Sequence, residues 1–227
     1  MLKLFAAACV ATAVSLSAFA QEKTTDNDVK DGKPTAGETK PYEIKRLIIG
    51  KSVVINKEFA DKNGIPEPSP FSITIPTGED FLTLLDTKKG GFLKVTFASP
   101  DREFLESVQF VDMEVPADLK EKRTPAIAQL MSQKVFVNAT KDLKDAKVLA
   151  IRETEIGGLG AVEVIGRYTD ADSGLIYLWI FGLPHPVNSK GTYAIATLHF
   201  GRRPIVTDQD FRNTLAGRAI FSFQYIE

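Results

Sequence analysis

The stretch AKVLAIRETEIGGLGAVEVIGRYTDADSGLIYLWIFGL, residues 146–183, decides which fold this sequence predicts. It contains three runs rich in β-branched and aromatic residues, separated by short connectors of Gly, Asp and Ser. Runs bounded in this way are typical of β-strands. Connectors this short join antiparallel neighbours, because a parallel crossover needs a dozen or more residues. A fourth run, GTYAIATLHF (191–200), extends the predicted antiparallel sheet.

The glycine cluster at 157–160 lies between the first two runs. Gly158 and Gly160 match the start of a dinucleotide-binding G-x-G-x-x-G motif, but Glu163 occupies the position of the third glycine. The run that follows alternates like a strand, whereas phosphate binding at this motif requires a helix N-terminus. The sequence therefore predicts a hairpin turn in which glycine supplies a positive φ, and no nucleotide cofactor.

The next connector contains Asp170, Asp172 and Gly174. One short turn offers too few oxygen ligands for a calcium ion unless distant residues contribute. Asp, Ser and Gly are also the residues that a hairpin tip requires. We therefore expect a turn here, and we predict no metal site and no cofactor for the chain.

Strand-like runs also occur upstream of this region. Two apolar runs, 42–50 and 51–59, lie on either side of Gly50 and are expected to pair with each other. Apolar and polar residues then alternate in three further segments, which we predict as strands. These are FSITIP (71–76), GFLKVTFA (91–98) and SVQFVDMEV (107–115).

Helices are predicted at two places. Thr124 is expected to cap a helix whose first residue is proline, and a capping-box pattern begins at Thr207. Gly217 is expected to end the second helix, and AIFSFQYI (219–226) to form a last strand. Together the elements predict an α+β fold, a central antiparallel sheet with helices packed on it.

The chain begins with the features of a secretory signal peptide at residues 1–20. Lys3 precedes an apolar stretch too short to span a membrane, and small residues at 18 and 20 suit a signal peptidase. The only cysteine, Cys9, lies in this segment. Residues 21–41 are polar and predict a flexible tail, followed by one α+β domain at 42–227.

The charge pattern limits the classes of partner. The chain has 28 basic and 29 acidic residues and no strongly basic face is indicated, so nucleic acid is not an expected partner. No apolar run after the leader is long enough to predict a transmembrane segment. An envelope protein is the expected partner, and the oligomeric state is left open.

Two groups of candidate site residues emerge. Exposed loops often carry recognition, which favours an interaction rim. The residues of this rim are Pro184, His185, Pro186, Arg202 and Arg203.

The second group is the run GLIYLWIFGLPHP (174–186), which is typical of a strand buried on both faces. Its alternative interpretation is an apolar pocket around Tyr177 and Trp179. The only histidines, His185 and His199, are not at metal-ligand spacing, so a structural or surface role is favoured for each.

The order of the segments resembles a known family. PFSITIPTGEDF (70–81) resembles the F-S-I-x-I-P-x-G opening of PsbP-like and DcrB-like domains. GLGAVEVIGRY (158–168), GTYAIATLHF and FRNTLAGRAIFSFQY (211–225) follow in the family's order. The resemblance implies a PsbP-like fold and a non-enzymatic assembly or accessory role, without a shared catalytic motif. Glu79–Asp80 and the segment 42–69 depart from the pattern, so the resemblance implies no specific partner.

The sequence as a whole favours an exported, periplasmic, non-enzymatic binding or assembly-accessory protein of the bacterial envelope. Two alternatives stay open. One is a periplasmic hydrolase with a His/carboxylate site, and the other is a carrier of an apolar ligand near Trp179.

Overall fold

The computed structural model describes residues 40–87 and 91–226. The expected signal peptide at 1–20 lies outside these residues, and so does the expected tail at 21–41 except for Lys40 and Pro41, which are exposed. Within the described residues, no helix is long and apolar enough to cross a membrane.

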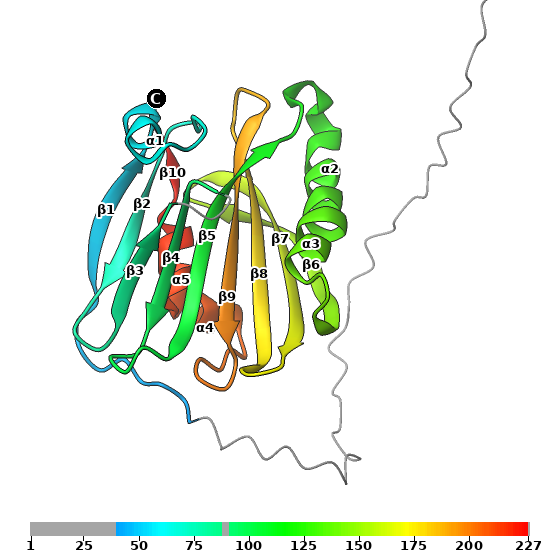
Figure 1. Ribbon diagram of the computed structural model, residues 1–227. Helices are drawn as coiled ribbons and strands as arrows, with labels where there is room; N and C mark the ends of the chain where they lie inside the picture. The colour runs from blue at the N-terminus through cyan, green and yellow to red at the C-terminus, as the bar shows by residue number, and fades with distance from the viewer. Residues whose placement is uncertain (1–39, 88–90, 227) are drawn as a thin grey trace, which may run out of the picture. The chain divides into compact units, whose positions relative to one another are not determined.

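The strands form two sheets, and all their pairings are antiparallel. The large sheet has the strand order β3-β4-β5-β9-β8-β7-β6, and the small one has the order β1-β2-β10 (Figure 1). The elements in chain order are β1 (Ile49–Ile55), α1 (Lys57–Asn63), β2 (Phe71–Thr77), β3 (Leu82–Asp86), β4 (Leu93–Ala98), β5 (Phe104–Glu114), η1 (Ala117–Lys122), α2 (Arg123–Leu130), η2 (Met131–Val135), α3 (Phe136–Ala139), β6 (Lys144–Ile156), β7 (Leu159–Asp170), β8 (Gly174–Pro184), β9 (Lys190–His199), α4 (Asp208–Asn213), α5 (Leu215–Phe221) and β10 (Gln224–Tyr225).

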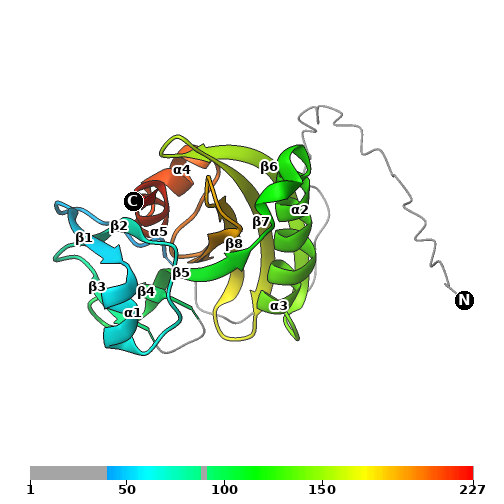
Figure 2. The same cartoon turned by 90° about the horizontal axis from the view of Figure 1, so that it is seen from above.

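Helices cover both faces of the large sheet, so the predicted α+β class with a central antiparallel sheet is confirmed. Figure 2 shows α2 and α3 on one face, beside β6 and β7, and α4 and α5 on the other. We call these the α2 face and the α5 face. The larger apolar core lies on the α5 face and includes side chains of the small sheet, and a second core lies under α2 and α3.

Both expected hairpin turns are confirmed. Gly157 and Gly158 have φ of 58° and 82° and join β6 to β7, with Ile156 paired to Leu159. This two-residue turn needs positive φ at both positions, which glycine adopts without steric cost. At the next turn, Asp170 Oδ1 accepts hydrogen bonds from the backbone N–H groups of Asp172 (3.1 Å) and Ser173 (2.8 Å). Neither segment precedes a helix.

Strand β8 is buried on both faces, as its continuous apolar run predicts. Leu178 and Ile180 belong to the core under α2, and Trp179 and Phe181 belong to the core on the α5 face. The strand is therefore the part of the sheet against which both helical layers pack.

Two glycines allow the helical segment 123–139 to lie close to the α2 face. A β-carbon on Gly182 of β8 would overlap Cγ2 of Ile127, and one on Gly166 of β7 would overlap the Phe136 ring. The sheet thus has two hollows that receive helix side chains. They fix the helical segment over β7 and β8.

The predicted pairing of the runs beside Gly50 is wrong. Strand β1 runs through Gly50 and pairs with β2, because Gly50 leaves room for the Thr74 side chain. The predicted run 51–59 does not continue as a strand to its end, because helix α1 begins at Lys57. Asn56 caps this helix by accepting a hydrogen bond from the Phe59 N–H (3.0 Å), and Gly64 ends it with a φ of 64°.

The first predicted helix begins two residues earlier than expected. Its N-cap is Lys122, and Thr124 lies in the first turn. Pro125 is accommodated there because the first N–H groups of a helix have no intrahelical partner.

The chain end also differs from the prediction. The capping box at Thr207 is confirmed, but Gly217 does not end a helix. It is buried inside α5, where its N–H donates to Thr214 Oγ1 (2.9 Å) and makes Thr214 the cap of a second helix. Residues 215–221 are therefore helical, and only Gln224 and Tyr225 pair with β2.

We expect Gly182→Ala to lower the free energy of unfolding by about 1–3 kcal/mol, because the new methyl group overlaps Ile127 in a packed core. Gly160→Ala is the matched control. Gly160 also lies in a strand, and an added β-carbon there meets nothing within 4 Å. Urea unfolding at equilibrium measures both. Equal stabilities of the two variants would show that the helix does not dock into this hollow.

Candidate functional site

The predicted interaction rim is divided between two ends of the large sheet. Pro184 pairs with Gly191 at the start of β9, whereas Arg202 and Arg203 follow the other end of that strand, at His199. Eight residues of strand separate these ends by about 26 Å. The two loops lie at opposite ends of β9 in Figure 1. The rim residues therefore do not form one surface.

At the first end, the proline-flanked His185 has a structural role. Its Nδ1 accepts hydrogen bonds from the backbone N–H groups of Val187 (3.1 Å) and Asn188 (3.3 Å), and its ring packs against Tyr225 at 4.7 Å. The Arg123 guanidinium donates to the carbonyls of His185 (2.8 Å) and Asn188 (2.7 Å). These bonds hold the loop to the start of α2.

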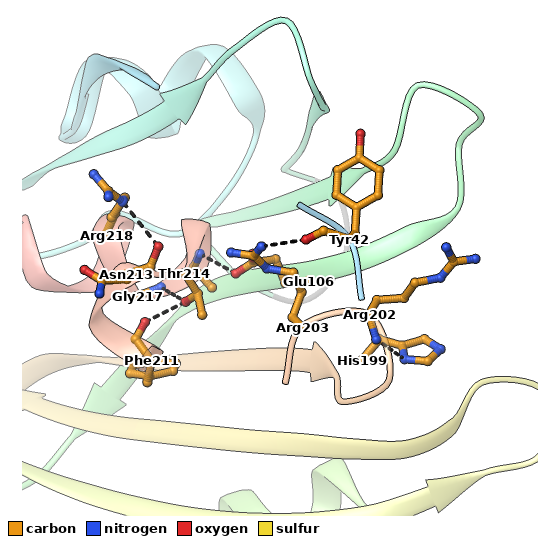
Figure 3. Close-up of polar contacts among 11 residues, drawn as sticks. Tyr42, Glu106, His199, Arg202, Arg203, Phe211, Asn213, Thr214, Gly217 and Arg218 are labelled. Atoms are coloured by element: carbon orange, nitrogen blue, oxygen red, sulfur yellow. Dashed lines mark hydrogen bonds and ion pairs between the residues drawn. The ribbon is translucent and has the colours of Figure 1, made fainter. Parts of the chain in front are cut away.

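At the other end, Arg203 is half of an ion pair with a fully buried carboxylate. Its Nε donates to Glu106 Oε1 (3.1 Å), and its Nη1 donates to the carbonyl of Tyr42 (3.1 Å) (Figure 3). Glu106 Oε2 accepts from the backbone N–H of Ala216 in α5 (2.8 Å). Burial raises the pKa of Glu106, while Arg203 and the Ala216 N–H act in the opposite direction.

Arg202 and His199 lie at the same end and hold the chain locally. The Arg202 N–H donates to His199 Nδ1 (3.3 Å), and the Arg202 carbonyl accepts from the Tyr42 N–H (2.8 Å). The Arg202 guanidinium pairs with Glu103, which is more than half exposed. Arg202 and Arg203, which the sequence favoured for recognition, thus hold the backbone at Tyr42 to this end of the sheet.

Trp179 is part of the core and the half-buried Tyr177 packs against it, whereas the sequence offered an apolar pocket around them as an alternative. Trp179 stacks on Phe211 at 3.9 Å between ring centroids, and Tyr177 packs against Phe200 at 5.2 Å. Trp179 also lines a small pocket of about 210 Å³, but that pocket carries charged side chains. These include Arg152, Glu163, Asp208 and Arg212.

A larger cleft of about 600 Å³ opens on the α2 face, and we call it the helix–sheet cleft. It exists because the glycine hollows place segment 123–139 over β7 and β8, which leaves the same face of β9 and β5 uncovered. Its floor consists of alternate residues of β9 and β5, and its wall consists of helix side chains. The residues used below are Val111, Asp112, Glu114, Leu130, Lys134, Asn138, Tyr168, Tyr193, Ile195 and Thr197.

The cleft combines apolar contact surface with polar groups that have no partner. Within residues 40–87 and 91–226, the side chains of Lys134, Asn138, Tyr168 and Tyr193 make no hydrogen bond or ion pair. Burial raises the pKa of both tyrosines, so their hydroxyls stay protonated and can donate. An apolar lining with a few unpaired polar groups is the usual composition of a binding site.

Two carboxylates lie at one end of the cleft, on the strand that forms part of its floor. Asp112 and Glu114 lie near the end of β5, and Lys190 pairs with Glu114 across the strands. Burial raises the pKa of Asp112, and Lys190 partly opposes this effect. Asp112 and Glu114 alternate with Val111 and Met113 and so belong to the other face of β5, whereas Lys134 supplies a positive charge to the helical wall of the cleft.

Sequence reasoning missed this cleft. The alternation of β9 did show which residues share a face, since Ala194 and Ala196 are fully buried while Tyr193 and Ile195 are half-buried on the other side. No local pattern shows that a helix covers β8 but not β9. As for metal chemistry, the described part of the chain contains no group of three or more His, Cys, Asp or Glu side chains that could hold an ion.

No protein-family model and no curated protein match the chain. Among solved structures, it is similar to the cyanobacterial PsbP protein CyanoP of Synechocystis sp. PCC 6803, with a TM-score of 0.47 and 12% identity over 78% of this chain and 94% of that chain. It is also similar to LpqN, involved in cell envelope biogenesis of Mycobacterium tuberculosis, with a TM-score of 0.41 and 11% identity over 78% and 89% of the two chains. A PsbP protein is thus among the similar structures, and membership of that family stays a prediction.

We expect Glu106→Gln to lower the free energy of unfolding by about 3–5 kcal/mol, because it leaves Arg203 largely buried without its counter-charge. Glu103→Gln is the matched control, since it removes the exposed pair with Arg202 and should cost less than about 1 kcal/mol. Chemical unfolding followed by circular dichroism measures both. Losses of equal size would contradict the role of the buried pair.

A second prediction concerns pH. Burial lowers the pKa of His185 and His199 below the ordinary value of 6.5. The unfolded chain therefore binds protons before the folded one as the pH falls, and the histidines reduce stability below about pH 6.5. We expect the native protein to lose stability relative to the double variant His185→Gln, His199→Gln between pH 7 and 5. Parallel stability curves for the two proteins would show that neither histidine titrates differently on folding.

Proposed function

We propose that this protein is a non-enzymatic binding or assembly-accessory protein of the bacterial envelope, and that its helix–sheet cleft binds an extended segment of a partner protein. The observation that carries the proposal is the cleft itself. It joins an apolar floor to four polar side chains, those of Lys134, Asn138, Tyr168 and Tyr193, that have no partner within the described residues.

The form of the cleft favours a polypeptide over a small molecule. Small-molecule sites enclose most of the ligand surface. Here the helical segment makes a wall on one side, while Val111 and Ile195 on the neighbouring strands stay half-buried. The floor from Tyr193 to Thr197 follows β9 for about 13 Å, which matches four residues of extended chain.

The side chains define what the partner segment offers. Leu130, Val111 and Ile195 provide contact surface for apolar residues, and the tyrosine hydroxyls and Asn138 can bond to a backbone. Lys134 suits an acidic residue near the middle of the segment. Such a segment is amphipathic and carries a negative charge.

The two alternatives from the sequence gain no specific support. Nδ1 of both histidines is used by backbone N–H groups, which leaves each ring in a structural role. The surroundings of Trp179 are charged, which does not suit an apolar cargo. Export through a signal peptide at residues 1–20 remains part of the proposal, and intact-mass analysis of the purified protein tests cleavage after Ala20.

Site-specific photocrosslinking tests the cleft. A photoreactive amino acid replaces Tyr193 in the cleft, and in a control protein it replaces Lys51, which is exposed on β1 of the small sheet. We expect a discrete adduct with one envelope protein from position 193 only. We also expect Lys134→Glu to reduce its yield at least about ten-fold, because the substitution places a like charge against the partner.

The outcome is read by mapping the crosslinked peptides with mass spectrometry. Adducts of equal yield from positions 193 and 51, or an adduct insensitive to Lys134→Glu, would contradict binding in the cleft. The folded state of each variant is checked by its unfolding transition, so that loss of structure is not mistaken for loss of binding.

A further inference from the structure

The register of the strands divides the helix–sheet cleft into two ends. Tyr193 of β9 pairs with Gly182 of β8, and a β-carbon on Gly182 would overlap Ile127. Ile127, in the first part of the helical segment, therefore lies at the level of Tyr193 on the sheet. We call this the Tyr193 end of the cleft.

The other end of the cleft lies at Thr197. Thr197 pairs with Leu178 of β8, which in turn pairs with Gly166 of β7. A β-carbon on Gly166 would overlap the Phe136 ring, so Phe136 lies at this level of the sheet. Between the two levels the helical segment and β9 rise by the same distance, about 13 Å. The helical wall therefore runs along β9 from the Tyr193 end to the Thr197 end.

The Tyr193 end is lined mainly by apolar groups. Val111 of β5 pairs with Tyr193, Met113 lies two residues further along β5, and both line the cleft. Leu130 supplies the wall here, because it follows Ile127 by less than one helical turn. This end therefore suits an apolar side chain of a ligand.

The Thr197 end carries polar groups that can donate hydrogen bonds. Lys134 and Asn138 flank Phe136 on the helical wall, and Tyr168 and Thr197 line the cleft from the sheet. Within residues 40–87 and 91–226, the side chains of these four lining residues make no hydrogen bond or ion pair. An ammonium, an amide and two hydroxyls can all donate. This end therefore suits an acceptor with a negative charge.

The charges around the cleft favour an acidic group at the Thr197 end over one at the Tyr193 end. Lys134 is the charged lining residue of the Thr197 end. Asp112 and Glu114 lie near the Tyr193 end, on the other face of β5, and Lys190 offsets part of their charge. Asp170, further along β7, is not a lining residue and accepts hydrogen bonds within its own turn.

We infer that the partner segment carries an acidic residue four positions away from an apolar one, an inference that rests on the proposed function. Four residues of extended chain span about 13 Å, which is the distance between the two ends. Residues four apart in an extended chain also point to the same side, here toward the cleft. The apolar side chain contacts Val111 and Leu130, and the acidic one accepts hydrogen bonds from Lys134 and Tyr168.

Selection from a phage-displayed library of random dodecapeptides on the purified protein tests the motif. We expect the enriched peptides to share an Asp or Glu four positions from a Leu, Ile, Val or Phe, in either order. Enriched peptides that lack an acidic residue, or that show no preferred spacing to the apolar residue, would overturn the inference. The same holds if no peptide is enriched.

A double-mutant cycle tests whether the acidic residue pairs with Lys134. The tightest peptide, capped at both ends, and its acid-to-amide counterpart are titrated by fluorescence anisotropy. We expect loss of the acid to weaken binding to the native protein at least about ten-fold, and binding to Lys134→Gln less than about two-fold. Lys51→Gln is the matched control, since Lys51 is exposed on β1 and this variant should respond like the native protein. Equal losses in the native protein and Lys134→Gln contradict the pairing.

The failure of this inference can be told apart from the failure of the proposed function. The selected peptide is incubated with the protein that carries the photoreactive amino acid at position 193. A peptide without an acidic residue that crosslinks there overturns the motif and leaves the cleft as the binding site. A peptide that binds but does not crosslink there contradicts the cleft itself. If Lys134→Gln does not fold, the acid-to-amide change in the peptide still decides, because it leaves the protein unaltered.

Discussion

The buried carboxylate of Glu106 is the interaction on which the arrangement of the chain depends. It lies within β5, yet it accepts hydrogen bonds from Arg203, which follows β9, and from Ala216 at the start of α5. Arg203 extends the connection to the backbone at Tyr42. A buried charge is tolerated only when it is paired and hydrogen-bonded, so these segments must come together for the core to close. One side chain thus specifies where both ends of the domain attach.

The packing of β8 explains where the helix–sheet cleft lies. Gly166 and Gly182 admit helix side chains on the α2 face and place the helical segment beside β9, which leaves the cleft. On the other face, Phe211 covers the ring of Trp179 but leaves its N–H without an acceptor within the described residues. The cleft is therefore a product of core packing and is not carried by the protruding loops.

Local patterns predicted much of the fold and little of the candidate sites. The four-stranded meander and its glycine turn follow from alternation and turn chemistry, which act over a few residues. The apolar run at 219–226 predicts a strand, but a short run of this kind suits a buried helix equally well. The hydrogen bond from the Ala216 N–H to the distant Glu106 favours the helix, and no local pattern encodes it. The rim residues do not form one surface, because Pro184 lies beside the start of β9 and Arg203 follows the other end of that strand. The cleft depends on helix placement, which no local pattern encodes.

We propose that a partner in the envelope occupies the helix–sheet cleft. It is tested most directly by comparing the rates of maleimide labelling of Ile195→Cys in the purified protein and in the intact envelope fraction, read by mass spectrometry of the labelled peptide. Val54→Cys, at an exposed position on β1, serves as the reference. We expect labelling at 195 to slow at least about ten-fold in the envelope and labelling at 54 to stay unchanged. Equal labelling rates at 195 in the two preparations would contradict it.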